Sequence, residues 1–503
     1  MTATDAETAG GSRRVTINPV TRLEGHGKIE IFLDASGEVA DCFFQVPELR
    51  GFEKFCEGRP AEEMPRITSR ICGVCPEAHL MASAKACDAL WKVEPPLAAR
   101  LLRELQYDFF YVTDHTTNFY ALAAPDFLLG PDSDPSTRNL IGVIRKVGVE
   151  IGSRVIQCRQ WGHEAAAIFG GKPVNPLNAI PGGVSKPLGA KERDRLEEIA
   201  LFMVEFGKFT LKLFHDVVLS EPRYVDLIVN GPYTHATYSM GLVDDLNRVN
   251  FYDGKVRVVD QDGKEFCKFA ADEYAEQIAE RVEPWTYLKF PYLKRIGWKG
   301  FVDGADSGVY RSTPQARLNV SDSLSTPVAQ EAFEEYFETL NGNGSARRPV
   351  HQTLAIHWAR VIETLNAAER ALELVRDPRI TDQQNYRAVP TAIPTEGVGV
   401  VEAPRGTLFH HYATDGNGII RKVNLIVGTT HNHAAICMSI KKAAQGLIRR
   451  GGEIGEGLLN RIEMAFRAYD PCYGCATHSL PGQMPLRVRL RGPDGSVLKE
   501  LIR

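Results

Sequence analysis

Two Cys-x-x-Cys pairs stand near opposite ends of the 503-residue chain, Cys72 with Cys75 and Cys472 with Cys475. Four thiolates favour soft or borderline metals and exclude Mg²⁺ or Ca²⁺ at the same position. Zinc sites usually keep their pairs about 12–20 residues apart, whereas nearly the whole chain separates these two. The spacing alone therefore leaves three interpretations open: a structural zinc site, a dithiol redox pair, and two unrelated pairs.

The residues around each pair favour metal-binding thiolates. Pro76 suits the first position of a helix, so Cys75 is predicted to cap a helix N-terminus. Its sulfur would face unpaired N–H groups and the positive helix end, which both favour the thiolate. His79 follows on the same helix face and could donate a hydrogen bond to sulfur. At the second pair, Pro471 restricts the backbone and Gly474 permits close approach to a metal.

Hydrophobic periodicity predicts the elements that must position these cysteines. Apolar residues at helical spacing predict long helices over residues 104–124, 137–169, 191–214, 352–374, 434–448 and 454–468. Alternating residues and turn signals predict strands over residues 28–34, 38–46, 255–260, 264–269, 398–401 and 421–427. We therefore expect an α+β fold, with a large helical core bundle and β-sheets at its periphery.

The composition argues against several classes of protein. A net charge of −4, from 59 basic and 63 acidic residues, gives no electrostatic case for binding nucleic acid or an anionic membrane. No apolar run approaches the roughly 18 residues that span a bilayer. Residues 1–14 lack the apolar block of a signal peptide and are predicted to be a flexible tail. We expect a cytoplasmic protein without a membrane span or a nucleic-acid partner.

Six motifs resemble those of the nickel–iron hydrogenase large subunit. They occur in the family's order and span nearly the full length of the chain. The motifs are Thr21-Arg-Leu-Glu-Gly-His26, Arg50-Gly-Phe-Glu53, Arg70-Ile-Cys-Gly-Val-Cys75, Glu402-Ala-Pro-Arg-Gly406, Val427-Gly-Thr-Thr430 and Asp470-Pro-Cys-Tyr-Gly-Cys-Ala-Thr-His478. The resemblance implies one large-subunit domain over residues 15–478. The residues around the motifs are most similar to the cytoplasmic group, which includes viologen-reducing, deazaflavin-reducing and NAD-linked enzymes.

The resemblance implies that all four cysteines hold nickel. Cys75 and Cys475 would also bridge to an iron that carries CO and cyanide ligands. Arg405 would lie over the open position between the metals, and Asp114 would orient its guanidinium. Three further residues would surround the iron and its ligands: Pro404, Leu408 and Thr429.

The resemblance also implies the reaction, which is the reversible heterolytic cleavage of H2. Cys472 is the expected proton acceptor, Arg405 is the alternative, and Glu24 would be the first carboxylate of the proton exit path. Outside the two pairs, the chain has no cysteine cluster for iron–sulfur centres of its own. Electrons would therefore pass to an iron–sulfur small subunit, and further electron-transfer subunits are expected.

A second metal ion and a processing step are implied near the C-terminus. Glu53, the backbone oxygen of Leu425 and His478 match the family's ligands for magnesium or a similar hard ion. Residues 479–503 follow His478. In the family, a maturation protease removes such an extension, and other maturation proteins insert nickel and iron. The sequence therefore resembles the precursor of a processed subunit.

Three alternatives compete with a hydrogenase. The quinone-reducing subunit of respiratory complex I is related in fold but lacks the nickel cysteines, which this chain has. A protein held by a zinc tetrathiolate would contain zinc and no nickel. An H2 sensor of the same fold would keep the cysteines and turn over slowly.

Overall fold

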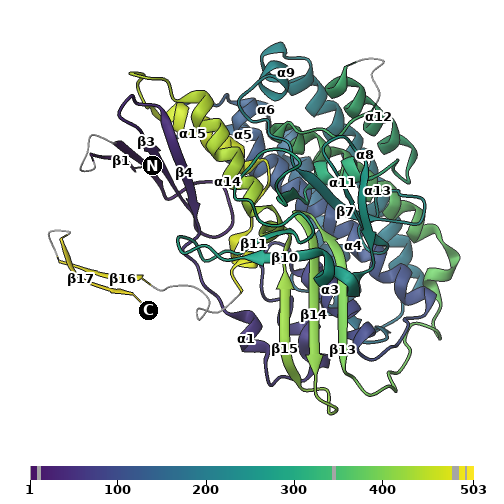
Figure 1. Cartoon of the computed structure of the whole chain (residues 1–503). Coiled ribbons are helices and arrows are strands. Elements are labelled where there is room, and N and C mark those ends of the chain that lie inside the picture. The colour runs from purple at the N-terminus through teal and green to yellow at the C-terminus, as the bar shows by residue number, and fades with distance from the viewer. Residues whose placement is uncertain (1, 8–12, 343–346, 479–486, 493–495, 503) are drawn as a thin grey trace.

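Long helices form the centre of the molecule (Figure 1). The computed structural model describes residues 2–7, 13–342, 347–478, 487–492 and 496–502. α13 (Ile356–Arg376) packs against both α4 (Leu97–Thr117) and α8 (Ala190–Phe214), and α7 (Val149–Gly170) packs against α4. α13 is buried on nearly every side, as expected for a helix inside a bundle. The predicted α+β class is confirmed, with helices at the centre and strands around them.

Two of the predicted helices end earlier than their apolar patterns suggest. The predicted helix over residues 137–169 is divided into α6 (Leu140–Val147) and α7. Gly148 lies between them with φ of 92°, a backbone conformation in which an α-helix cannot continue. α4 gives way to a π-helical segment, Asn118–Ala123, before α5 (Ala124–Leu128). Apolar spacing survives both interruptions, so the pattern alone does not reveal them.

A four-stranded antiparallel sheet stands at one side of the bundle. Its strands pair in chain order: β1 (Thr2–Glu7), β2 (Arg13–Asn18), β3 (Lys28–Leu33) and β4 (Val39–Gln45). The predicted hairpin of β3 and β4 is confirmed. The sheet begins inside residues 1–14, which the sequence predicts as a tail; residues 8–12 of that stretch lie outside the described residues. Pairing of β1 uses main-chain groups, so it leaves little signal in side-chain type.

A three-stranded sheet carries the segment around Arg405. It consists of β13 (Glu396–Ala403), β14 (Gly406–Thr414) and β15 (Ile420–Ile426). α3 (Pro76–Leu90) packs across β13. A Cβ atom at Gly399 would lie 2.1 Å from the carbonyl oxygen of Ala82, so only glycine permits this approach. The sheet thereby brings the helix after the first cysteine pair close to the β13–β14 turn.

The remaining elements complete the bundle and its periphery. A third sheet has the order β12 (Tyr310–Arg311), β7 (Tyr238–Val243), β8 (Lys255–Val259), β9 (Glu265–Phe269), which confirms the predicted β8–β9 hairpin. The last two long helices are α14 (Gly428–Leu447) and α15 (Glu456–Arg467). Other helices and strands are α1 (Phe52–Cys56), α2 (Met64–Thr68), α9 (Pro222–Val229), α10 (Tyr274–Gln277), α11 (Pro314–Val320), α12 (Pro327–Asn341), α16 (Tyr473–Ala476), β5 (Ala179–Ile180), β6 (Gly183–Val184), β10 (Ile278–Arg281) and β11 (Phe290–Leu293).

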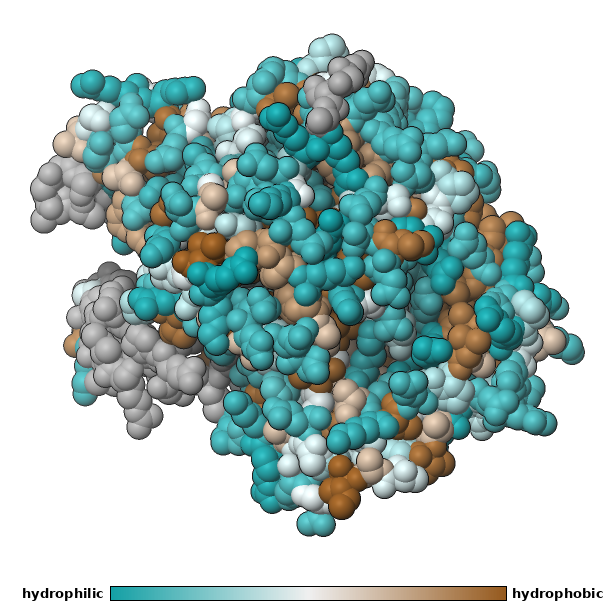
Figure 2. Space-filling model, turned by 45° about the vertical axis from the view of Figure 1, so that its right-hand side comes forward, coloured by the Kyte–Doolittle hydropathy of each residue, from teal (hydrophilic) through white to brown (hydrophobic). Residues whose placement is uncertain are grey.

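The C-terminal extension contains an antiparallel hairpin, β16 (Arg487–Arg491) with β17 (Val497–Ile502). Figure 1 shows this hairpin to one side of the main body. Figure 2 shows a face on which hydrophilic side chains predominate and apolar ones are scattered among them. Among the described helices, none is both long and apolar enough to cross a membrane.

Candidate metal centre

The two cysteine pairs meet inside the molecule although they are far apart in sequence. The Sγ atoms of Cys72 and Cys472 are 3.4 Å apart, and those of Cys75 and Cys475 are 3.2 Å apart. Within the second pair the two Sγ atoms are 2.9 Å apart. All four sulfurs lie within 4.8 Å of one another, are buried, and form no disulfide. Four convergent sulfur donors of this kind fit a soft or borderline metal.

Helix starts position both pairs. Cys75 is the N-cap of α3 and Pro76 is its first residue, as predicted. Cys472 is likewise the N-cap of the short helix α16, which contains Cys475. The amides of Val74 and Cys75 both donate to the Sγ of Cys72, at 3.2 Å each. The backbone donors at this turn therefore reach the first sulfur of the pair, whereas the sequence directed them to the second.

The electrostatics of the cluster call for a cation. Hydrogen bonds from the other three cysteines lower the pKa of Cys72 well below its ordinary value. Burial raises the pKa values of Cys472 and Cys475 well above theirs. Four buried thiolates in mutual contact repel one another, so they can coexist when a bound metal supplies positive charge.

Glu24 touches the second pair. Its Oε2 lies 3.0 Å from the Sγ of Cys472 and accepts a hydrogen bond of 2.8 Å from the amide of Gly474. A Cβ atom at Gly474 would lie 2.5 Å from the other carboxylate oxygen, so glycine makes room for this contact. Glu24 also lines an open cavity of about 430 Å³, together with Glu48 and Arg70. The carboxylate therefore stands between a buried sulfur and the surface.

Arg405 lies between two carboxylates in the two-residue turn that joins β13 to β14. Its Nη1 is 3.1 Å from Oδ2 of Asp114, and its Nη2 is 2.8 Å from Oδ2 of Asp470. Burial raises the pKa of Asp114 to about 6, although the charge of Arg405 opposes this shift. Asp470 was not singled out by sequence reasoning. The available signal was its place at the start of the motif that contains the second cysteine pair.

His79 and Thr429 also border the cysteines. The Nδ1 of His79 lies 3.1 Å from Nε2 of His410, and its own Nε2 is buried without a hydrogen-bond partner among the described residues. Burial lowers the pKa of His79 to about 4, which favours the neutral ring. Thr429 Oγ1 accepts a hydrogen bond of 2.9 Å from the amide of Cys472. Its hydroxyl hydrogen is then free for a second acceptor. Leu408 is fully buried in β14.

Comparison with known proteins places this geometry in a family. A family model described as nickel-dependent hydrogenase matches residues 50–129 and 306–478, and one described as HoxL-like matches residues 14–49. The F420-non-reducing hydrogenase iron-sulfur subunit of Archaeoglobus profundus is 48% identical over 97% of this chain and 99% of its own length. The chain belongs to the nickel-dependent hydrogenase family.

Two further relatives support membership in this hydrogenase family. The NAD-reducing hydrogenase HoxS subunit beta of Cupriavidus necator is 39% identical over 98% of this chain and 100% of its own length. A solved NAD⁺-reducing [NiFe]-hydrogenase in the H2-reduced state superposes with a TM-score of 0.85, at 36% identity, covering 93% of this chain and 99% of that one. The nickel–iron hydrogenase resemblance is confirmed, and the chain is a large-subunit homologue in a family of oxidoreductases that act on H2.

A second cluster of polar groups lies where the resemblance implies a hard metal ion. The Oε1 of Glu53 is 3.2 Å from Nδ1 of His478 and accepts a hydrogen bond of 2.9 Å from the amide of Leu425. Burial would raise the pKa of Glu53, but His478 and Lys289 lower it to about 2. The Nε2 of His478 is buried without a hydrogen-bond partner among the described residues. The three predicted ligand residues are thus brought together in this hydrogenase homologue.

Proposed function

We propose that this chain is the catalytic subunit of a [NiFe] hydrogenase that cleaves H2 reversibly into protons and electrons. The observation that carries the proposal is the group of four buried, unbridged sulfurs within 4.8 Å of one another. Arg405 and Glu24 lie beside it, one as a buried cation and the other as a carboxylate that reaches the surface. The residues present fit a nickel–iron pair, since the sulfurs supply four soft donors and lack the charge that a metal would add.

In this proposal all four cysteines hold nickel, and Cys75 and Cys475 also hold iron. The bound metals would supply a Lewis acid that polarises H2 and a store for its electrons. CO and cyanide on the iron would need apolar walls and a few hydrogen-bond donors. Four residues around the sulfurs would provide them: Pro404, Leu408, Thr429 and His79.

Proton transfer would begin at Cys472. Its Sγ is within hydrogen-bond distance of the Glu24 carboxylate, so a proton can pass directly between the two groups. Glu24 lines the open cavity with Glu48, Arg50 and Arg70, which offers the proton a way to solvent. Arg405 remains the alternative proton acceptor. Its two buried carboxylate partners, however, raise its pKa well above the ordinary value despite the opposing effect of burial, so it holds its proton firmly.

Electrons would leave through an iron–sulfur partner subunit. Gly73 and Val74, between the first two sulfur ligands, are exposed, so a partner can approach the metals closely there. An adjacent cavity runs from Val74 to Thr117 and Arg159, which also border a second, mostly apolar cavity. Exposed apolar side chains surround the second cavity: Leu140, Ile141, Val149 and Ile156. Apolar surface of this kind is typical of a protein interface.

This docking surface can be tested by copurification. Ile156→Asp and Val149→Asp should each reduce the amount of iron–sulfur subunit that copurifies with the tagged chain, because a charge would be buried without a partner. Leu246→Asp changes an equally exposed apolar residue in the β7–β8 connection and should leave copurification unchanged. Equal recovery of the partner with all three variants would refute the surface assignment.

We further propose a Mg²⁺ or similar hard ion at Glu53, the backbone oxygen of Leu425 and His478, and removal of residues 479–503 by a maturation protease. His478 is buried, and its carbonyl oxygen accepts from the amide of Glu53 at 3.3 Å. The family match also ends at residue 478. Nickel and iron insertion proteins would act before cleavage. We infer a single domain over residues 15–478 and a cytoplasmic location.

The deciding experiment is metal analysis combined with H2-dependent viologen reduction, on protein matured with its partner subunits. Nickel and iron in equal amounts, with rapid dye reduction, would support the proposal. Stoichiometric zinc without nickel would refute it. Full nickel and iron content with very slow turnover would instead support the H2-sensor alternative.

A further inference from the structure

The turn that carries Arg405 is held by side chains at four consecutive carbonyl groups. The carbonyl of Glu402 accepts hydrogen bonds from the hydroxyls of Tyr107 and Tyr111, at 2.6 and 2.7 Å. The carbonyls of Ala403 and Pro404 each accept a hydrogen bond of 3.0 Å from Arg317. The carbonyl of Arg405 itself accepts one of 2.8 Å from Asn432. Donors from three helices, α4, α11 and α14, therefore fix the backbone of one tight turn.

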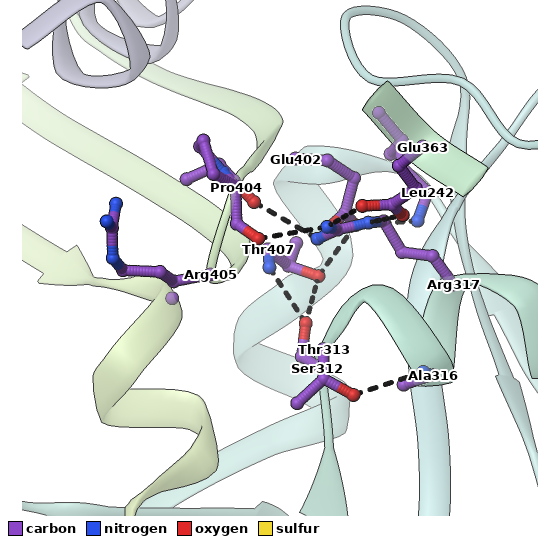
Figure 3. A network of polar contacts seen from close by, with 12 residues as sticks. Leu242, Ser312, Thr313, Ala316, Arg317, Glu363, Glu402, Pro404, Arg405 and Thr407 are labelled. Atoms are coloured by element: carbon purple, nitrogen blue, oxygen red, sulfur yellow. Dashed lines mark hydrogen bonds and ion pairs between the residues drawn. The ribbon is translucent and has the colours of Figure 1, made fainter. Parts of the chain in front are cut away.

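Arg317 takes the two central positions of this clamp and is itself fully buried. Its Nε and Nη2 bind the two carboxylate oxygens of Glu363 at 2.6 Å each, and its Nη1 is 3.0 Å from Oε2 of Glu402. The planar guanidinium can satisfy both carboxylates and both carbonyls at once, which a lysine ammonium cannot. Figure 3 shows Arg317 reaching Glu363, Glu402 and Pro404, while the Arg405 side chain extends away on the other side of the turn.

The opposite side of the turn is where the chemistry would occur. The guanidinium of Arg405 contacts Asp114 and Asp470, and Asp470 is two residues before Cys472. A displacement of about 1 Å in a group that acts on a reacting centre can lower the rate by about a hundredfold. Holding the backbone at four carbonyls therefore restricts where the base of the Arg405 side chain can lie. Two acidic partners then restrict its end.

We propose that Arg317 is a positioning residue for the reaction, and that it acts through Arg405 by holding the carbonyls of Ala403 and Pro404. The inference rests on the proposed function for its effect on rate, but its effect on geometry does not depend on that function. It assigns a role to a residue outside all six motifs, on a helix that contributes no residue to the proposed metal ligands.

The test combines a structure with a double-mutant cycle. Arg317→Lys keeps the buried charge and should lose at least one of the two carbonyl contacts. In the crystal structure of the matured variant, Arg405 should separate from Asp114 or Asp470 while nickel content stays at the wild-type level. H2-dependent dye reduction should fall about tenfold or more. Because the effect passes through Arg405, the Arg317→Lys, Arg405→Lys double variant should be no slower than Arg405→Lys alone.

A matched control separates positioning from general loss of stability. Arg103 is also fully buried, pairs with Asp88, and donates to the carbonyls of Ile180 and Gly183. Arg103→Lys should lower the melting temperature but leave the Arg405 contacts and the rate unchanged. If Arg317→Lys does not accumulate as folded protein, the Tyr107→Phe, Tyr111→Phe variant removes the donors at Glu402 and leaves the buried charges paired. It should then show the same displacement of Arg405.

Several outcomes would overturn the proposal. They are an unchanged Arg405 geometry in the Arg317→Lys or the double tyrosine variant, wild-type activity with Arg317→Lys, and a double variant whose loss equals the product of the single losses. A wild-type protein without H2 activity would refute the proposed function alone, since the crystallographic comparison would still test the clamp.

Discussion

The Oε2 of Glu24 lies 3.0 Å from the Sγ of Cys472, although 448 positions separate the two residues in the chain. A parallel β-bridge between these residues holds the two backbone segments together, and the amide of Tyr473 donates to the carbonyl oxygen of Glu24 at 3.0 Å. The contact therefore depends on the main chain as well as on the side chains. It connects the proposed metal centre to a surface cavity.

Glu24→Gln should impair proton transfer while leaving metal binding intact. Glutamine keeps the size and the hydrogen-bonding oxygen of the side chain but cannot exchange a proton near neutral pH. We expect H/D exchange with D2O to fall about a hundredfold or more, with unchanged nickel content. Glu48→Gln lines the same cavity and serves as the control, with near-normal exchange. Wild-type exchange in Glu24→Gln would contradict the relay role.

Cys472→Ser and Cys75→Ser should each abolish H2-dependent dye reduction and lower nickel content. A serine hydroxyl is a harder and far less acidic ligand than a thiol, so the four-sulfur site would be lost. Cys267→Ser replaces a half-buried cysteine in β9, outside the cluster, and should retain both nickel and activity. A fully active Cys472→Ser protein would refute the ligand assignment.

Mass spectrometry of the active subunit should give a chain that ends at His478. Cleavage there would free the end of the segment that carries Cys472 and Cys475, which could then close over inserted metal. Protein produced without the maturation protease should keep residues 479–503 and show no H2-dependent dye reduction. A fully active chain that still ends at Arg503 would contradict the proposed processing.

Gly399→Ala should destabilise the contact between α3 and β13. The added Cβ would lie 2.1 Å from the carbonyl oxygen of Ala82, so helix and strand must separate. We expect a loss of about 3 kcal/mol in unfolding free energy and lower nickel retention, because α3 follows Cys75. Gly416→Ala, where no atom lies within 4 Å of the added Cβ, should change neither property. Equal thermal melting of the two variants would contradict this account.

Asp108→Asn should make the protein more stable at pH 8 than at pH 5, relative to wild type. Burial raises the pKa of Asp108 well above its ordinary 3.8. Above pH of about 4 the unfolded chain has lost a proton that the native state keeps, so the stability of the wild type falls as the pH rises. Asparagine removes this dependence. Asp245→Asn, at an exposed position, is the control, and parallel melting curves for both variants across this pH range would refute the prediction.

Local sequence was sufficient for features that depend on neighbouring residues. Pro76 after Cys75 predicted the start of α3, and Asp262-Gly263 predicted the turn between β8 and β9, and both are confirmed. Each follows from backbone restrictions of the residues concerned. The break at Gly148 was missed because a single glycine leaves the apolar spacing on either side unchanged. Strand β1 was missed because its pairing uses main-chain groups.

The sequence by itself determined which residue types are available to the proposed centre: four cysteines in two tight pairs, a carboxylate at Glu24 and a guanidinium at Arg405. Only the tertiary structure decided that the four sulfurs meet, that Asp470 joins Asp114 at Arg405, and that Arg317 holds the turn behind it. The reason is physical. Motif residues can be recognised from local spacing, whereas partners hundreds of residues apart are selected by packing and by the need of buried charges for counter-charges and hydrogen bonds.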